Sequence, residues 1–430
     1  MTVANNLTLG VTACGSGSGS LNSGTIEVYG DVYDMGSCGA AGSVNVKMVG
    51  TGGKQVTFTT GNGRIPNLEI AKTGGAGVTL SGTVNIAGSF KRSSGTLSPG
   101  TSTVVMQAWQ SSSVMDLGVA DLNNLSFDIN SGINLSGSNI TVLGNLLSRF
   151  PCGSGNLNID NGTVNVKGNI TLAGSAYCAM VGSVNVVING TGAQTLSGTI
   201  AGSSNYSIPN VTIDKPSGTL TLAGTIYFYN NLTYVQGTVD TGTSTVRLVT
   251  TFGTGYFQSP GVSFYNLEIM PVFGMTMNLS GTTFTASNNL ILDTSWGCSG
   301  ATLTNGTVET SGNLAIGTYS SCGINSGNAN VAFVGTGANA TFTKNGNLPG
   351  SGTLSINKAG RIVSIVANTS TGRPVTVTAG TLNMAGFNLT IPTSLTLGSG
   401  TNVTRGGSGV LTVNGSTIPD GAYSGGTIDP

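Results

Sequence analysis

The chain has 430 residues, of which 69 are glycine and none is histidine; only 7% are charged, and 15 basic residues balance 15 acidic ones. Phosphate binding needs clustered lysine and arginine, so this composition argues against a nucleic-acid partner. The lack of histidine excludes catalysis by a serine or cysteine paired with histidine. No apolar run approaches the roughly 18 residues of a membrane-spanning helix. The N-terminus lacks the basic start and apolar core of a secretion signal.

Strand patterns begin near the N-terminus and recur along the chain. Residues 24–33, 162–172 and 218–229 alternate small or polar residues with Val, Ile, Leu or aromatic residues. Glycine, asparagine or serine interrupts the alternation about every 8–12 residues, as between short strands. No window shows sustained helical periodicity, and the abundant Gly, Thr, Val and Asn are poor helix formers. We therefore expect an all-β protein.

Six cysteines divide the chain into repeats. They form the pairs Cys14/Cys38, Cys152/Cys178 and Cys298/Cys322, with 24, 26 and 24 residues between partners. The phrase IPNLEI at 65–70 returns as IPNVTI at 208–213, GTSTV at 100–104 returns at 242–246, and GTG recurs at 50–52, 190–192 and 335–337. Such self-similarity indicates repeats of about 143 residues. We assign them to residues 1–151, 152–297 and a shortened 298–430, stacked as one continuous rod.

The even number of cysteines in local pairs predicts three disulfides and an oxidising compartment. The predicted bonds are Cys14–Cys38, Cys152–Cys178 and Cys298–Cys322. A metal site is disfavoured because the chain has no CxxC motif and no histidine. We expect no cofactor.

Two architectures fit these strands, a parallel β-solenoid and three tandem β-sandwiches. In a parallel solenoid, one coil takes about two dozen residues and neighbouring coils stack about 4.8 Å apart. Cysteines 24–26 residues apart then meet within the Cα separation of roughly 4.4–6.8 Å that a disulfide requires. We favour the solenoid, with about 18 to 20 coils and a length of roughly 90 Å. Asn210, Asn231, Asn266 and Asn289 follow Pro, Asn or Tyr and precede Val or Leu, which predicts stacked asparagines at the corners.

Three phrases carry a family resemblance: GTVNIAGSF at 82–90, GTVNVKGNI at 162–170 and GTVETSGNL at 306–314. These short strands between glycine-rich corners resemble the β-helical passenger domains of secreted bacterial adhesins, of the filamentous-haemagglutinin and autotransporter type. The segment LTVNGSTIPDGAY at 411–423 is similar to terminal segments of secreted repeat proteins. The resemblance implies surface structure and adhesion, not a reaction.

Acidic residues offer a weak case for an enzyme. Secreted β-helices are often polysaccharide lyases or hydrolases, and glycoside hydrolysis needs two acids about 5–10 Å apart. The four glutamates lie in repeated strands, and the close acid pairs Asp31/Asp34 and Asp116/Asp121 recur in no other repeat. We expect no catalytic residue and rank a polysaccharide-degrading enzyme third among the functions.

Aromatic residues gather in the second repeat, among them Tyr227, Tyr229, Tyr256 and Phe257. Their functional interpretation is a contact patch on which sugar rings stack. The alternative is stacking inside the solenoid core. Because alternation along a strand turns at least half of such residues inward, the core interpretation is favoured.

The leading functional prediction is an extracellular or cell-surface structural protein that assembles with copies of itself into a filament or sheath. Residues 144–152 and 288–298 close one repeat and lead into the next, and the chain begins with a similar phrase at 4–14. Within it, Asn6, Leu7, Thr8 and Leu9 alternate polar and apolar side chains. We expect this assembly segment to add as a strand to another copy, giving a head-to-tail polymer. Alternatively, the first repeat is truncated and loops cap both ends.

The competing function is a monomeric β-helical adhesin or glycan-binding rod, with surface glycans as its partners. An aromatic patch displayed to solvent would favour this function over self-assembly.

Overall fold

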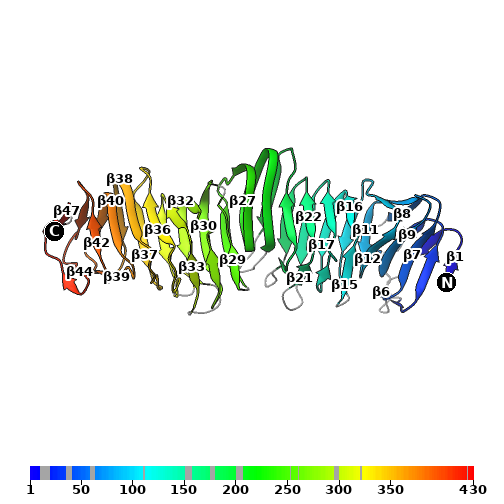
Figure 1. Ribbon diagram of the computed structural model, residues 1–430, viewed down its shortest axis with the longest axis horizontal. Helices are drawn as coiled ribbons and strands as arrows, with labels where there is room; N and C mark the ends of the chain where they lie inside the picture. Colours follow the sequence, from blue (N-terminus) through cyan, green and yellow to red (C-terminus); the bar gives the residue numbers. More distant parts are fainter. Residues whose placement is uncertain are drawn as a thin grey trace. The chain divides into compact units, whose positions relative to one another are not determined.

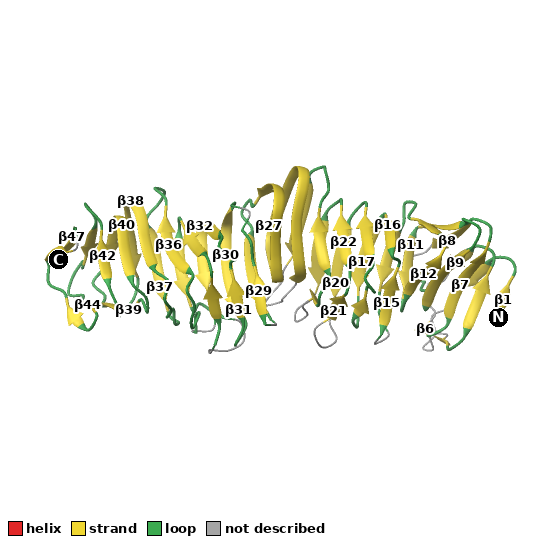
Figure 2. Cartoon of the chain, in the orientation of Figure 1, coloured by secondary structure: helices red, strands yellow, loops and turns green. Residues whose placement is uncertain are grey.

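The computed structural model describes residues 1–9, 20–34, 41–58, 63–109, 112–150, 157–174, 180–199, 207–251, 253–259, 261–294, 300–319, 322–423 and 425–430. These residues include no helix; strands make up 62% of the structure and form a β-solenoid of about 17 turns (Figure 2). The predicted all-β solenoid is confirmed, with slightly fewer turns than expected. Two compact units are distinguished: unit 1 is Met1–Leu222 with Val235–Asp240, and unit 2 is Ala223–Tyr234 with Thr241–Pro430.

Unit 1 contains three main sets of hydrogen-bonded strands and one two-stranded pair (Figure 1). The first sheet holds β1 (Thr2–Val3), β4 (Thr25–Val28), β7 (Asn45–Gly50), β9 (Asn67–Lys72), β12 (Phe90–Ser94), β15 (Ser113–Asp116), β18 (Ile133–Asn134), β21 (Leu157–Asp160) and β24 (Met180–Val181). The second holds β2 (Leu7–Leu9), β5 (Val32–Asp34), β8 (Lys54–Phe58), β10 (Gly77–Ser81) and β13 (Thr96–Ser98). The third holds β11 (Thr83–Ile86), β14 (Thr103–Met106), β16 (Val119–Leu122), β17 (Asn124–Asp128), β19 (Asn139–Val142), β20 (Leu146–Phe150), β22 (Thr163–Val166), β23 (Ile170–Gly174), β25 (Asn185–Ile188), β26 (Gln194–Thr199) and part of β27 (Ser207–Asp240). The pair is β3 (Ser20–Leu21) with β6 (Ala41–Gly42).

Unit 2 continues the same architecture in its own strands. Its long sheet holds β28 (Thr245–Thr250), β30 (Ser263–Pro271), β32 (Thr283–Leu292), β34 (Thr307–Thr310), β35 (Asn313–Ile316), β36 (Asn330–Val334), β37 (Ala340–Lys344), β38 (Leu354–Ile365), β40 (Val375–Asn383), β42 (Leu395–Leu397), β43 (Asn402–Thr404), β46 (Gly421–Tyr423) and β47 (Gly426–Asp429). Two shorter sheets hold β29 (Thr254–Tyr256), β31 (Thr276–Asn278) and β33 (Thr302–Thr304), and β39 (Thr369–Ser370), β41 (Leu389–Ile391), β44 (Leu411–Val413) and β45 (Ser416–Thr417).

Strand pairing distinguishes the solenoid from tandem sandwiches. Thr25 pairs with Asn45 and Asn45 with Asn67, in parallel and about one coil apart along the chain. Parallel pairing of this kind runs through both units, and the antiparallel pairs among the described strands are β44 with β45 and β46 with β47. Sandwiches are built from antiparallel strands, so the sandwich alternative is excluded.

The core of each unit is made of columns of apolar side chains, one from each coil. In unit 2, Val246, Leu267, Leu290, Leu314 and Phe342 are successive register partners, and each is 2% exposed or less. Neighbouring residues on the same strands point outward, because side chains alternate along a strand. Each buried Leu or Phe contributes about 1.5–3 kcal/mol, so the columns supply the driving force for stacking.

The predicted asparagine ladder is present at Asn266 and Asn289. Asn289 donates from Nδ2 to Asn266 Oδ1 at 3.0 Å, and Asn313 extends the ladder by donating to Asn289 Oδ1 at 3.1 Å. By contrast, Asn210 donates to the backbone oxygen of Val184, and the Oδ1 of Asn231 accepts from the backbone of Tyr256. Both amides thus satisfy backbone groups of another coil.

A row of alternating charges crosses the first sheet of unit 1. Register pairing places Glu27, Lys47, Glu69, Lys91 and Asp116 side by side on five successive strands. Lys47 and Glu69 form an ion pair at 3.9 Å. Burial alone would raise the pKa of the Glu69 carboxyl, but hydrogen bonds from Ser93 and Asn45, together with Lys47 and Lys91, lower it. Opposite charges on neighbouring strands therefore hold the row together.

Three buried lysines occupy equivalent places 143 residues apart. Lys72, Lys215 and Lys358 are each at most 1% exposed. Their ammonium groups donate to carbonyl oxygens at the GTG corners one coil earlier: Lys72 to Val49 at 2.6 Å, Lys215 to Gly190 and Gly192 at 2.8 Å, and Lys358 to Val334 at 3.1 Å. Burial lowers the pKa of all three ammonium groups. The common environment supports a 143-residue repeat, whose boundaries remain a prediction.

The cysteines fall mainly outside the described residues. Cys14, Cys38, Cys152, Cys178 and Cys298 lie in segments that the structure does not describe. Cys322 is described, and its side chain is buried. The three disulfides therefore stay a prediction.

Replacing Lys215 by methionine should destabilise unit 1 by about 2–4 kcal/mol, because the carbonyls of Gly190 and Gly192 would lose a buried donor. Urea-induced unfolding followed by circular dichroism measures the change. Lys167→Met is the matched control, because Lys167 is exposed and its loss should cost less than about 0.5 kcal/mol. Equal stability of the two variants would contradict the role assigned to the buried lysines.

Peptide mapping under non-reducing conditions should recover Cys14–Cys38, Cys152–Cys178 and Cys298–Cys322. Each bond closes a loop of about 25 residues and should contribute on the order of 3 kcal/mol by chain entropy. A long-range bond such as Cys38–Cys152 would refute this pairing.

Candidate functional site

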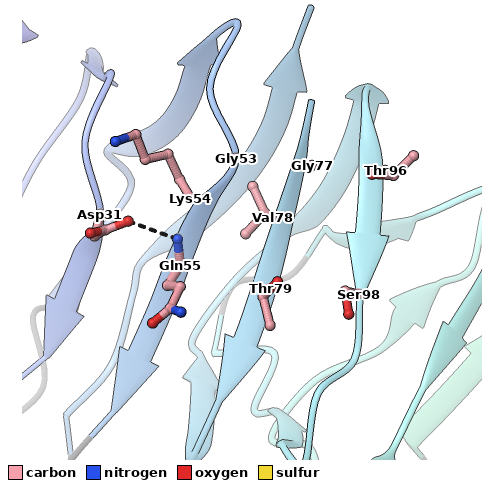
Figure 3. Close-up of a pocket in the computed structure, with 9 residues that line it drawn as sticks. All are labelled: Asp31, Gly53, Lys54, Gln55, Gly77, Val78, Thr79, Thr96 and Ser98. Carbon is pink, nitrogen blue, oxygen red and sulfur yellow. Dashed lines mark hydrogen bonds between the residues drawn. The ribbon is translucent and has the colours of Figure 1, made fainter. Parts of the chain in front are cut away.

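The outward face of the second sheet in unit 1 carries an open polar groove (Figure 3). Asp31, Gln55, Thr79 and Ser98 lie on or next to successive strands, because Val32 pairs with Val56, Thr79 with Gln55, and Ser98 with Thr79. The groove has a volume of about 500 Å³. Asp31 is already engaged, since its carboxylate accepts from the Gln55 backbone at 2.9 Å and the Tyr33 hydroxyl at 3.2 Å. Lys54 also lines the groove, which therefore combines amide and hydroxyl groups with one ammonium group.

A more enclosed pocket, of about 230 Å³, lies on the outward face of β28, β30, β32 and β35 in unit 2. The residues that line it are Thr245, Asn266, Glu268, Asn289, Leu290, Ile291, Asn313, Ala315 and Thr318. Its floor includes the asparagine ladder described above. We call it the Tyr319 pocket, because Tyr319 follows the lining residue Thr318 and its hydroxyl donates to Glu268, which also lines the pocket.

An ion pair adjoins the Tyr319 pocket. Arg247 and Glu268 are register partners on β28 and β30, and the guanidinium Nε donates to the Glu268 carboxylate. The Arg247 Nη1 donates to the hydroxyl of Tyr227, its register partner on β27. Burial disfavours the charge of Arg247, but Glu268 and Tyr227 outweigh burial and raise the Arg247 pKa. The side chains of Arg247 and Glu268 are 20% and 7% exposed, so the pair is mostly shielded from water.

Tyr319 reaches this ion pair from the connection between β35 and β36. Its hydroxyl donates to Glu268 Oε1 at 3.2 Å and accepts from Arg247 Nη2 at 3.4 Å. The Tyr319 backbone N–H donates to the carboxylate of Asp293, which ties the connection to the end of β32. Burial and the charge of Glu268 raise the pKa of the Tyr319 hydroxyl, so it stays a neutral hydrogen-bonding group. The residue is still 55% exposed and offers part of its ring to solvent.

These groups suit binding of a small polar molecule with an apolar face. The asparagine amides provide donors and acceptors in fixed positions, and the exposed ring of Tyr319 provides a surface for stacking. Glu268 already accepts from both Arg247 and Tyr319. It therefore acts as a held hydrogen-bond acceptor rather than as a free acid.

The predicted aromatic patch needs correction. Tyr227, Tyr229 and Phe257 are 2%, 6% and 0% exposed, so they belong to the packed interior, as the core interpretation expected. Burial raises the pKa of Tyr229 to about 12. Only Tyr256 of the four is exposed, and it lines a separate open depression with Asn278. Simple alternation would turn Tyr227 and Tyr229 outward, but contacts such as that of Arg247 cover Tyr227.

Sequence patterns did not reveal the Tyr319 pocket. Tyr319 lies 72 residues after Arg247 and 51 after Glu268, and no motif links the three. The one available signal was how few residues are charged. With only 7% charged residues, an arginine and a glutamate on neighbouring strands, such as Arg247 and Glu268, are an uncommon combination.

The predicted assembly segment is paired within its own chain, where Leu7, Thr8 and Leu9 form β2. Leu7 pairs with Val32, and the side-chain oxygen of Asn6 accepts from the Asp31 backbone at 2.8 Å. Leu9 is buried, whereas Thr8 points to solvent. The segment is thus part of β2 on β5, rather than a strand detached from the fold.

Comparison with known proteins gives no relative. No protein-family model, curated protein or solved structure matches the chain. In the described residues, no helix is long and apolar enough to span a membrane. The structure agrees with β-helical proteins in general, and the finer resemblance to adhesin passenger domains remains a prediction.

Proposed function

We propose that this protein is an extracellular, adhesin-type β-solenoid that binds glycans. The observation that carries the proposal is the Tyr319 pocket, where a ladder of asparagine amides adjoins Glu268 and the half-exposed Tyr319 donates its hydroxyl to that carboxylate. Sugar rings present apolar C–H faces and hydroxyl edges, and aromatic rings with amide groups complement both. The size of about 230 Å³ suits a single sugar unit of a longer chain.

We propose binding rather than catalysis at this pocket. Hydrolysis of a glycosidic bond needs two carboxyl groups, one of them free to give or take a proton. Glu268 is the acidic residue among those that line the pocket, and Arg247 and Tyr319 already engage it. The polar groove of unit 1 supports the same function, because its amide, hydroxyl and ammonium groups can form hydrogen bonds with sugar hydroxyls.

Removing the ring of Tyr319 should weaken sugar binding about tenfold, through loss of stacking and of the hydroxyl that orders Glu268. Isothermal titration calorimetry with neutral oligosaccharides and oligogalacturonate measures the affinity of wild type and Tyr319→Ala. Tyr319→Phe keeps the ring and should lose less affinity. Tyr256→Ala is the matched control, because Tyr256 is equally exposed in the same unit but lines another depression. If Tyr319→Ala binds as tightly as Tyr256→Ala, the pocket is not the sugar site.

Self-assembly into a filament is the second candidate function. It is favoured by the position of β2, which is the outermost described strand of the five-stranded order β13-β10-β8-β5-β2. The Leu7 backbone N–H donates to Asp31, so the backbone groups of Thr8 face away from β5. An edge of this kind can pair with a strand of another copy.

Thr8→Pro should abolish or shorten any filaments, because proline removes the outward N–H of the edge without removing a bond to β5. Negative-stain electron microscopy compares Thr8→Pro with Thr8→Val, which keeps the backbone donor. Filaments of equal length in the two variants, or a wild-type protein that stays monomeric at high concentration, would refute assembly through β2.

A further inference from the structure

The Tyr319 pocket is built on two parallel rows of outward side chains. The first row is the ladder that runs from Asn266 to Asn313. The second row lies two residues further along the same strands, where Glu268, Ile291 and Ala315 are successive register partners. Both rows line the pocket. Residues two apart on a strand point to the same face and lie about 7 Å from one another.

The asparagine row offers the pocket hydrogen-bond donors rather than acceptors. Each amide nitrogen donates once within the row: Asn266 to Thr245 at 3.2 Å, Asn289 to Asn266 at 3.0 Å, and Asn313 to Asn289 at 3.1 Å. An amide nitrogen carries two hydrogens, so each keeps one N–H that has no partner among the described residues. The Asn313 Oδ1, by contrast, already accepts from the backbone and the hydroxyl of Thr341 at 3.0 and 2.9 Å. A ligand therefore meets this row best with an acceptor.

The second row changes from polar to apolar across the pocket. Glu268 is held by Arg247 and Tyr319, whereas Ile291 and Ala315 are partly exposed and have no polar group in their side chains. We call Ile291 and Ala315 the apolar pair. A small apolar group that covers this pair gains free energy, because apolar surface is removed from water. The pocket thus places an apolar contact next to a row of donors.

Together the two rows select among the substituents that sugars carry. A hydroxyl group can pair with the amides, but it has no apolar part to cover the apolar pair. The methyl group of a deoxy sugar covers the apolar pair but gives the amides no acceptor. A carboxylate accepts from the amides, but it would come close to the carboxylate of Glu268, which also lines the pocket. An acetamido group carries a carbonyl acceptor and a methyl group on the same carbon, so it satisfies both rows.

We propose that the Tyr319 pocket recognises the acetamido group of an N-acetylated sugar. The acetamido carbonyl accepts from the remaining N–H groups of Asn289 and Asn313, and the methyl group contacts the apolar pair. The acetamido N–H donates to the hydroxyl of Thr318, which is exposed and lines the pocket. The inference rests on the proposed function and deepens it, since it names the class of sugar that this pocket binds.

Pairs of sugars that differ only in the acetamido group test this selectivity. Titrations followed by saturation-transfer NMR compare N-acetylglucosamine with glucose, and N-acetylgalactosamine with galactose, each as its methyl glycoside. We expect the N-acetyl sugar of at least one pair to bind about tenfold tighter than its parent sugar. In that complex, the protons of the acetyl methyl group should receive the strongest saturation from the protein, because they contact the apolar pair.

Ile291→Thr assigns the preference to this pocket. It keeps a branched side chain on the strand but replaces apolar contact with a hydroxyl, so it should weaken binding of the N-acetyl sugar about fivefold. Binding of the parent sugar should not change. Ile291→Leu stays apolar and should keep the preference. Ile362→Thr is the matched control, because Ile362 is an exposed isoleucine of the same unit that does not line the pocket. Circular dichroism melting curves check that each variant folds.

The inference and the proposed function fail in different ways. If both parent sugars bind as tightly as their N-acetyl derivatives, or if Ile291→Thr keeps the same preference as Ile362→Thr, the acetamido assignment is overturned and sugar binding by the protein stands. If neither these glycosides nor any of the oligosaccharides bind, both the inference and the proposed function are overturned.

Discussion

In-register stacking of parallel coils is the constraint on which the rest of this structure depends. A residue and its partner one coil later lie about 4.8 Å apart with their side chains in the same direction. Each side chain therefore packs against the side chain at the equivalent position of the next coil. Val246 above Leu267 gives a core column, and Asn266 beside Asn289 gives a ladder. By the same rule, a charged or bulky aromatic side chain has no suitable neighbour unless the next coil carries a complementary side chain at the same position.

This rule explains why the fold could be predicted from sequence and why much of the site could not. Cysteine spacing and strand alternation report on neighbouring coils, so coil length, the all-β class and the ladder at Asn266 and Asn289 were within reach. The burial of Tyr227 depends on a side chain from the next coil, Arg247, which alternation does not reveal. Tyr319 comes from a connection three coils after Arg247, and no sequence pattern near Tyr319 predicts its contacts with Arg247 and Glu268.

The buried lysines illustrate a signal that was visible but not interpreted. The phrase IPNLEIAK ends at Lys72 and IPNVTIDK ends at Lys215, and the matching position in the third repeat is Lys358. Each lies in a strand, about one coil after a GTG corner. A lysine in a chain with so few charges, at a position that should turn inward, indicated a role in satisfying carbonyl groups.

Regular rows give the surface its polarity, but the Tyr319 pocket occurs where regularity is interrupted. A row of asparagines or threonines presents the same group at each coil and has no feature that holds one ligand in one place. The connection that carries Tyr319 brings an aromatic residue to such a row, because the Tyr319 hydroxyl donates to Glu268, which lines the pocket together with Asn266. The regular coils supply repeated hydrogen-bonding groups, and the irregular connection determines where along the row a ligand binds.

The alternating row from Glu27 to Asp116 has a consequence for how the chain winds. Because the coils are similar in length and composition, a folding chain can pair the wrong ones. A chain that omits one coil still places apolar side chains against one another in the core. In this row, such an omission would bring Glu27 against Glu69, or Lys47 against Lys91, and like charges on adjacent strands are unfavourable. Omitting two coils would restore opposite charges. The row therefore distinguishes the omission of one coil from the omission of two. It disfavours the loss of a single coil, which is the error that needs the shortest loop.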